Sequence, residues 1–157
     1  MRTLYEQISK EMKGFGKTND FYRDWLFSKV SGHFTTSPKP GQMLFFSYNA
    51  LTADTLKWFD KYPLVMVTET TENHFIGGNL HYVSPNLRKS IGKQFQNGSL
   101  AYPIKMHHKY LRSNVNSPLF IIDKIQWADI GLIPTEWFVK VENGKTVKVS
   151  STQVWNS

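Results

Sequence analysis

Two apolar runs joined by a short polar turn constrain the fold of this chain most. The run PLVMVTET at residues 63–70 and the run HFIGGNLHYV at residues 74–83 are rich in β-branched and aromatic side chains, and TTEN stands between them. Such runs, separated by turn residues, predict the two strands of a hairpin. A third run, QMLFFSYN at residues 42–49, predicts another strand. The centre of the chain is therefore expected to form an antiparallel sheet.

The remaining strand signals extend this sheet. Gly77 and Gly78 interrupt a strand pattern, which predicts a bulge or the sharp bend by which small barrels turn corners. LFII at residues 119–122 predicts a buried strand, and FVKVENGKTVKV at residues 138–149 predicts a hairpin around Asn143-Gly144. Residues 134–137 are read as a single helical turn.

Helices are expected before the sheet. In residues 3–16, apolar side chains recur every four positions until two glycines end the run, and residues 17–32 carry an apolar stripe with acids in the early turns. Residues 33–41 hold two prolines and a glycine and are read as a linker. The N-terminal segment 1–32 is therefore predicted to be helical, and a barrel is predicted over residues 40–150.

Two further helices, both basic, are predicted inside the barrel region. Residues 84–98 have Pro85 at the first helical position, apolar side chains on one face, and cations around the other. Residues 102–114 are read as a second helix, with Ile104, His108 and Leu111 facing the core and the cations facing solvent.

The cations of these helices stand in a segment without acids. Residues 73–122 contain no Asp or Glu, yet they hold four of the five histidines of the chain. A like-charge segment of this length faces something negative or remains a solvated face without a partner. We predict that its cations bind DNA phosphates or an acidic protein. The candidate binding residues are Arg88, Lys89, Lys93, Lys105, His107, Lys109 and Arg112.

Length and composition favour one folded domain over residues 1–157. The 40% hydrophobic and 15% aromatic content exceeds that of a disordered chain. No run of eighteen apolar residues predicts a membrane span, and the charged N-terminus lacks the apolar centre of a signal peptide. The absence of cysteine excludes disulfides, a thiolate nucleophile and cysteine-ligated zinc.

No enzyme motif is present. The chain has no nucleophile elbow, P-loop, dinucleotide fingerprint or HExxH zinc motif. His107 and His108 lack a nearby acid, so we predict one core-facing and one surface imidazole and no metal. His81 is read as a strand histidine bonded to backbone. We therefore predict no catalytic residue, no cofactor and no enzymatic activity.

Aromatic side chains lie between the cations of the acid-free segment. Exposed rings at these positions could stack on unpaired bases, but core packing is the favoured reading for each of them. The residues concerned are Tyr82, Phe95, Tyr102 and Tyr110.

One resemblance is to the small SH3-like barrels of the PemK/MazF ribonucleases. PGQMLFFSYN at residues 40–49 and YPLVMV at residues 62–67 are similar to their strand–loop–strand layout. Tyr62 stands where those ribonucleases have an arginine, and no matching catalytic threonine is evident. This resemblance implies the barrel more than the nuclease.

A second resemblance covers residues 40–140. The segments FIGGNLHYVSPNLR, HHKYL and IPTEWF look like recurrent segments in a group of small proteins of contractile-tailed bacteriophages, some labelled DNA end protectors. The resemblance implies a non-enzymatic virion or assembly protein. The matching positions are Asp60, Pro63, Leu64, Gly78, Asn79, Leu80, His81, Tyr82, Pro134, Glu136 and Phe138.

The expected protein is an α+β fold: a small, bent, antiparallel SH3-like barrel with two N-terminal helices and inserted basic helices. Its expected function is that of a bacteriophage virion or DNA-packaging component, found in the virion or the host cytoplasm. DNA and other virion proteins are the expected partners, a symmetric assembly is compatible with this, and membrane insertion is not expected. A purely structural tail, neck or baseplate subunit is the close alternative, and a PemK/MazF-type endoribonuclease is the distant one.

Overall fold

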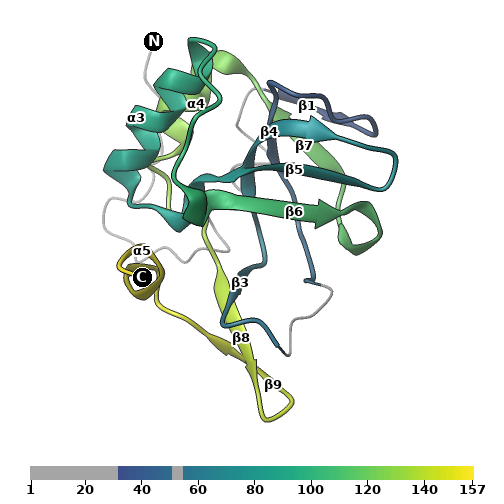
Figure 1. Ribbon diagram of the computed structural model, residues 1–157, viewed down its shortest axis with the longest axis vertical. Helices are drawn as coiled ribbons and strands as arrows, with labels where there is room; N and C mark the ends of the chain where they lie inside the picture. The colour runs from purple at the N-terminus through teal and green to yellow at the C-terminus, as the bar shows by residue number, and fades with distance from the viewer. Residues whose placement is uncertain (1–31, 51–54) are drawn as a thin grey trace, which may run out of the picture.

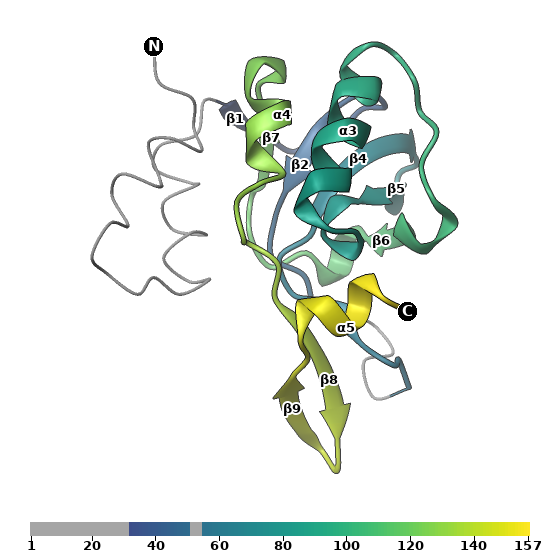
Figure 2. The same ribbon diagram turned by 90° about the vertical axis from the view of Figure 1, so that its left-hand side faces the viewer.

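The computed structural model describes residues 32–50 and 55–157. These residues form two antiparallel sheets, with helices packed against the larger sheet (Figures 1 and 2). The α+β class is therefore as expected. The two helices predicted over residues 3–16 and 17–32 lie outside the described residues, apart from Gly32, which begins a strand.

The larger sheet has six strands, and every neighbouring pair is antiparallel. Its spatial order is β1-β7-β2-β4-β5-β6. The runs predicted as strands at residues 42–49, 63–70, 74–83 and 119–122 each contribute one. The strands are β1 (Gly32–Thr35), β2 (Met43–Phe45), β4 (Leu64–Thr70), β5 (His74–Asn79), β6 (His107–Leu111) and β7 (Leu119–Ile122).

The strand β1 corrects the expected linker at residues 33–41. The prolines and glycine that suggested a linker all follow Thr35, and the residues before them pair with β7 along the whole of β1. Pairing with a buried strand satisfies backbone groups that a free linker would leave to water.

The hairpin of β4 and β5 carries the irregularity that the glycine pair predicted. Val67 pairs with Gly77 and Glu69 pairs with Ile76, so the register shifts between these two pairs. The extra residue, Thr68, belongs to β4. The glycines are needed for close contact: a Cβ on Gly77 would collide with the Met66 carbonyl oxygen, and one on Gly78 would lie 3.0 Å from the Tyr102 ring.

Both faces of the larger sheet are buried. One face packs against α3 (Pro85–Gln96) and α4 (Trp127–Ile130), and Figure 2 shows these two helices side by side. Gly92 allows this approach, because a Cβ there would lie only 3.1 Å from the Trp127 carbonyl oxygen. On the other face, four rings pack edge to face in a buried cluster: Phe46, Tyr48, Phe75 and Tyr110.

The second predicted basic helix does not form. Residues 102–114 contain only the short 3-10 turns η2 (Ile104–Met106) and η3 (Arg112–Asn114), with the edge strand β6 between them. Ile104, predicted to face the core, is 84% exposed. The alternating burial of HHKYL fits a strand, since successive side chains of a strand point to opposite faces.

The smaller sheet has the order β3-β8-β9, built from β3 (Phe59–Asp60), β8 (Phe138–Glu142) and β9 (Lys145–Lys148). Its hairpin turns at Asn143 and Gly144, whose φ angles are 53° and 76°. This confirms the turn that the Asn-Gly pair predicted, because a type I′ hairpin turn needs positive φ at both central residues. In Figures 1 and 2 the β8–β9 hairpin extends away from the rest of the molecule.

Residues 134–137 form no helical turn; they run extended into β8. The remaining short elements are η1 (Leu80–Tyr82), η4 (Lys124–Gln126) and α5 (Ser151–Trp155). Within residues 32–50 and 55–157, the strand order ends at β1 and β6, which do not pair with each other. The described strands therefore form a bent, open sheet where a closed SH3-like barrel was expected.

Candidate nucleic-acid interface

Arg88 is completely buried, which corrects its predicted place on the solvent face of α3. It occupies the helical face that also buries Ile91, Gly92 and Phe95. That face follows the i, i+3, i+4, i+7 spacing of a buried stripe, and an arginine stands at its first position. The long stem of arginine is apolar, so it can line a core when the guanidinium finds acceptors.

The guanidinium of Arg88 binds five acceptors. Its Nε donates to the carbonyls of Leu80 and Val83 at 2.8 and 2.9 Å, and Nη2 donates to the His81 carbonyl at 3.3 Å. Its Nη1 donates to the Gly131 carbonyl at 3.2 Å and to Glu136 Oε2 at 3.3 Å. Burial lowers the pKa of Arg88, and Glu136 opposes that shift. Arg88 therefore holds α3 against η1 and the segment before β8.

A second cluster of buried polar side chains joins the two sheets. Asp60 Oδ2 lies 2.7 Å from His81 Nδ1 and accepts from Asn79 Nδ2 at 3.0 Å, while His81 Nε2 lies 2.8 Å from Thr135 Oγ1. Asp60 Oδ1 accepts from the backbone N–H groups of Tyr62 and Trp137. Burial would raise the pKa of Asp60, but the charge of His81 and these hydrogen bonds hold it below its ordinary value.

His81 therefore does not fit the reading of a strand histidine bonded to backbone. It lies in η1, between a carboxylate and a hydroxyl, in an arrangement that nucleophilic catalysis also uses. Here the three side chains are shut off from solvent: Asp60, His81 and Thr135 are 3%, 0% and 1% exposed. In this arrangement the three side chains link β3, the end of β5 and the approach to β8 inside the protein.

The other predicted lysines and Arg112 differ in how far they are exposed and bonded. Lys105 Nζ donates to the carbonyls of Trp155 and Ser157 at 2.6 and 3.2 Å, so it ties η2 to the C-terminal residues. Arg112 Nη1 reaches the Thr36 carbonyl at 3.5 Å, and Lys89 is half-buried. Lys93 and Lys109 are exposed. The exposed lysines are the ones that can reach a phosphate without breaking an internal contact.

The two adjacent histidines behave as predicted, although on a strand. His107 is exposed and its Nδ1 lies 2.8 Å from the Tyr102 hydroxyl. His108 is half-buried, with its ring 4.3 Å from that of Tyr82 and its Nδ1 2.8 Å from the Met106 carbonyl oxygen. Burial lowers the pKa of His108, which favours the neutral imidazole.

The aromatic side chains of the acid-free segment are mostly core. Tyr82, Phe95 and Tyr110 are 8%, 4% and 4% exposed, as the favoured reading predicted. Tyr102 is half-buried, packed on Gly78 and stacked beside the His107 ring. None of these rings forms an open stacking platform on the surface.

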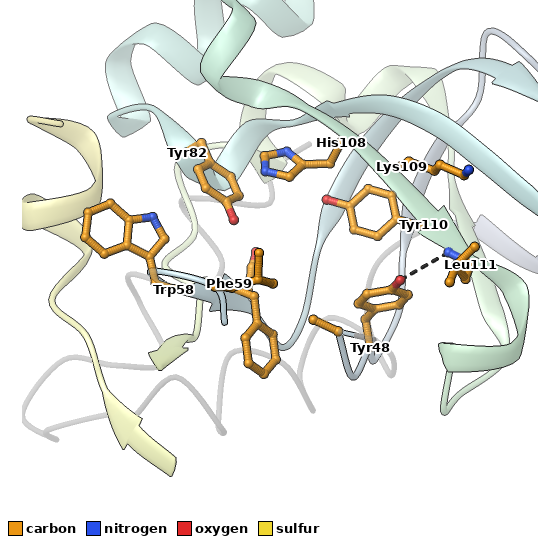
Figure 3. A pocket seen from close by; sticks show the side chains of 11 residues that line it. Tyr48, Trp58, Phe59, Tyr82, His108, Lys109, Tyr110 and Leu111 are labelled. Carbon is orange, nitrogen blue, oxygen red and sulfur yellow. Dashed lines mark hydrogen bonds between the residues drawn. The ribbon is translucent and has the colours of Figure 1, made fainter. Parts of the chain in front are cut away.

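A pocket of about 330 Å³ opens between β6 and β3. Figure 3 shows rings from both strands around it, with the hydroxyl ends of Tyr82 and Tyr110 directed into the space between them. Tyr48 closes one end, where its hydroxyl accepts a 3.1 Å hydrogen bond from the Leu111 N–H. The wall comprises Tyr48, Ala50, Leu56, Trp58, Phe59, Asp60, Tyr82, His108, Lys109, Tyr110 and Leu111.

The comparison with known families decides the affiliation of the chain. The model of a family described as "Phage T4 terminal DNA protecting protein" matches residues 2–102, well over half of the 157-residue chain. The chain belongs to this family. No curated protein and no solved structure matches significantly.

Membership of the terminal DNA protecting family confirms the phage resemblance found in the sequence, and no comparison supports the PemK/MazF likeness. The resemblance rested partly on Asp60, Asn79, His81 and Glu136. In the structure these four polar residues stand in the two buried contact groups, so in this protein these positions lie in the interior.

A second basic feature of this family member escaped the sequence reasoning. The β8–β9 hairpin was predicted, but its lysines were not considered as a group. Lys145 and Lys148 are exposed on β9, and Lys148 Nζ lies 6.0 Å from the centre of the Trp137 ring. Lys140 pairs with Glu142 at 3.7 Å. Counting cations near Asn143-Gly144 would have found this arm.

Two further findings concern the described parts of the chain. Within them, no group of three or more His, Cys, Asp or Glu residues is placed to hold a metal ion. Among the helices described, none is long and apolar enough to cross a membrane.

Proposed function

We propose that this protein binds the ends of phage DNA and shields them without chemical change to the DNA. The observation that carries the proposal is the family match, whose description names terminal DNA protection. The net charge of +7 and the 50 consecutive residues from 73 to 122 without an acid support it, because contact with phosphates dominates the affinity of proteins for DNA. Such a role places the protein in the virion or in the infected host cell.

The proposed contact surface is the exposed part of the acid-free segment. Lys93 on α3 and Lys109 on β6 have their charges in solvent, and His107 lies beside Lys109 on the same edge strand. Lys89, Lys105 and Arg112 are partly buried and contribute to the positive field around this surface. Arg88 is not part of this surface, because its guanidinium is buried and donates to Glu136 and four carbonyls.

A role without catalysis agrees with the chemistry of the described residues. The Asp60–His81–Thr135 contacts are the arrangement there that most resembles a catalytic group, and all three side chains are sealed in the interior. A protein that covers a DNA end needs phosphate contacts and a fitted surface and no reacting group.

The proposal is tested by comparing a linear duplex with a covalently closed circle of the same sequence. We expect tighter binding to the linear form, protection of its ends from an added exonuclease, and an affinity that falls linearly in log–log form with salt. Equal affinity for both forms, or cleavage of either one by the purified protein, would refute it.

A double variant, Lys93→Gln with Lys109→Gln, tests the contact surface. If both lysines neutralise phosphates, the slope of the log–log salt dependence should fall by about 1.8 in magnitude. Lys39→Gln is the matched control, because Lys39 is exposed but lies outside the acid-free segment. An unchanged slope in the double variant would move the DNA contact elsewhere, for example to the β8–β9 arm.

A further inference from the structure

We infer that the pocket between β6 and β3 receives one unstacked nucleobase from the end of the DNA. This inference rests on the proposed function and adds how an end is told from the interior of a duplex. The pocket volume of about 330 Å³ lies at the lower end of the range for small-ligand sites, which suits one nucleotide unit better than a base pair.

The walls of the pocket have the chemistry that a flat base requires. Rings approach from both strands: Trp58 and Phe59 from the β3 side, and His108 from β6 with its ring 4.3 Å from that of Tyr82. Figure 3 shows these rings arranged around a common space. Aromatic side chains hold unpaired bases by stacking, and they do so for every base because each has a π-face.

The polar atoms at the pocket suit the edge of a base. The Met106 carbonyl can only accept a hydrogen bond, so the His108 Nδ1 that lies 2.8 Å from it carries a proton. The neutral imidazole then keeps Nε2 as an acceptor. The Tyr48 hydroxyl accepts from the Leu111 N–H and retains its own proton as a donor. One acceptor and hydroxyl donors match the mixed polar edges of the bases without selecting one base.

Charge favours a base inside the pocket and a phosphate outside it. Asp60 contributes to the wall, but its oxygens are taken by Asn79, His81 and the N–H groups of Tyr62 and Trp137, so it offers an anion no donor. Two exposed cations lie near the pocket. Lys109 is part of the wall, with its charged end directed away from the rings in Figure 3. Lys57 has its Nζ 4.5 Å from the centre of the Trp58 ring, which lines the pocket. A base in the pocket would leave its phosphate outside, on the side of Lys57.

The pocket gives a physical reason for a preference for ends. A base inside a duplex is stacked on both sides and paired, and extracting it costs a few kcal/mol. The cost is least for a base that is already single-stranded, such as a terminal overhang. A pocket for one base therefore discriminates DNA ends from duplex interior without reading sequence.

The test uses the full chain and three duplexes, two of which carry one unpaired terminal nucleotide. In one duplex the overhanging base is 2-aminopurine, in a second that position is abasic, and in a third both ends are closed by hairpins. We expect 2-aminopurine fluorescence to be quenched on binding, because the base stacks on aromatic rings. The abasic duplex should bind at least about 5-fold more weakly than the 2-aminopurine duplex, since stacking on a protein ring is worth about 1–3 kcal/mol per base.

Variants assign the effect to the pocket. Trp58→Ala removes one wall and Tyr82→Phe removes one hydroxyl but keeps the ring, so both should reduce the quenching and the gap between the two overhang duplexes. Trp137→Ala is the matched control, since Trp137 is also half-buried but does not line the pocket. Far-UV circular dichroism on each variant confirms the fold.

The outcomes separate this inference from the proposed function. End-specific binding with no quenching and no abasic effect would overturn the pocket and leave the proposed function standing. Quenching that survives both pocket variants would show that the base binds elsewhere, which also overturns the inference. Binding to none of the three duplexes would refute the proposed function and the inference together.

Discussion

Two regions of this protein are rich in polar and charged side chains, and they use them in opposite ways. In the buried junction, defined by Asp60, Asn79, His81, Arg88, Thr135 and Glu136, the charges meet partners inside the protein. Along the exposed edge, defined by β6 and the rim of its pocket, Lys109 and Lys57 face solvent. Partners within the fold decide which of these charges remain exposed to solvent.

The helix α3 contains both cases. Arg88 and Lys93 stand five residues apart on one helix, one fully buried and one exposed. The planar guanidinium presents several donors at fixed angles, which lets Arg88 bind carbonyls and a carboxylate at once. A lysine has a compact charge and three donors, and it prefers water.

The comparison predicts the largest effect for Arg88→Met. The change removes the buried ion pair with Glu136 and the donors to four carbonyls, so we expect a loss of about 3–5 kcal/mol in the free energy of unfolding. Urea denaturation measures this loss. Lys93→Met, on the same helix, is the matched control and should stay within about 0.5 kcal/mol of the wild type.

Equal stability of the two methionine variants would break the comparison. It would mean that the carbonyls of Leu80, Val83 and Gly131 find water or other donors when the guanidinium is removed. The buried and exposed cations of α3 would then be interchangeable for stability.

A smaller effect is expected for Asp60→Asn. The amide keeps one oxygen for the N–H groups of Tyr62 and Trp137, but it turns a donor toward Asn79 or His81, which costs about 1–3 kcal/mol. Because the folded pKa of Asp60 is lowered, its contribution is present above the unfolded pKa and disappears as pH falls through the folded value.

Denaturation curves measured between pH 7 and pH 2 test both statements. The wild type should lose more stability than Asp60→Asn below about pH 4, the ordinary range of an aspartate. Parallel pH profiles for the two proteins would show that folding does not lower the pKa of Asp60.

The β8–β9 arm is predicted to be separable from both regions. Asn143 has a φ of 53°, and a β-branched residue resists that conformation, so Asn143→Val should cost about 1–2 kcal/mol while Asn143→Gly stays near the wild type. Thermal unfolding ranks the two variants. Loss of DNA binding in Asn143→Val, with the sheets still folded, would add the arm to the binding surface.

The sequence predicted the regular elements better than the contacts between them. Alternation and turn residues located β4, β5, β7 and the Asn143-Gly144 hairpin, because these signals are local. The segment HHKYL failed for the opposite reason: its cations fit a helical stripe, and only pairing with β5 makes it an edge strand.

The candidate site shows the same limit. Arg88 is buried because its guanidinium contacts carbonyls of η1 and Glu136, which lies 48 residues later in the sequence. No local sequence pattern predicts contacts between residues so far apart. The pocket likewise joins β3 to β6 through residues as far apart as Tyr48 and Leu111. Charge counting singled out the acid-free segment but could not sort its cations into buried and exposed ones.

The smallest predicted effect compares the two adjacent histidines. His108 packs between Tyr82 and Tyr110, and burial lowers its pKa, although the Met106 carbonyl and the charge of Asp60 favour the protonated form. Below the ordinary pKa of about 6.5 the unfolded chain therefore binds a proton that the folded protein resists. The sign follows from linkage: stability falls as pH drops through the window below that value and is regained above it.

His108→Gln removes this titrating group, so its stability should change less between pH 7 and pH 5 than that of the wild type. His107→Gln is the control, since it removes the adjacent, exposed imidazole, which does not line the pocket. The same titration bears on the pocket, because protonation converts the His108 Nε2 from an acceptor into a donor. Quenching of a terminal 2-aminopurine should therefore weaken with falling pH in the wild type and vary less with pH in His108→Gln. A pH response that follows His107 would show that the exposed imidazole, and not the pocket, senses the proton.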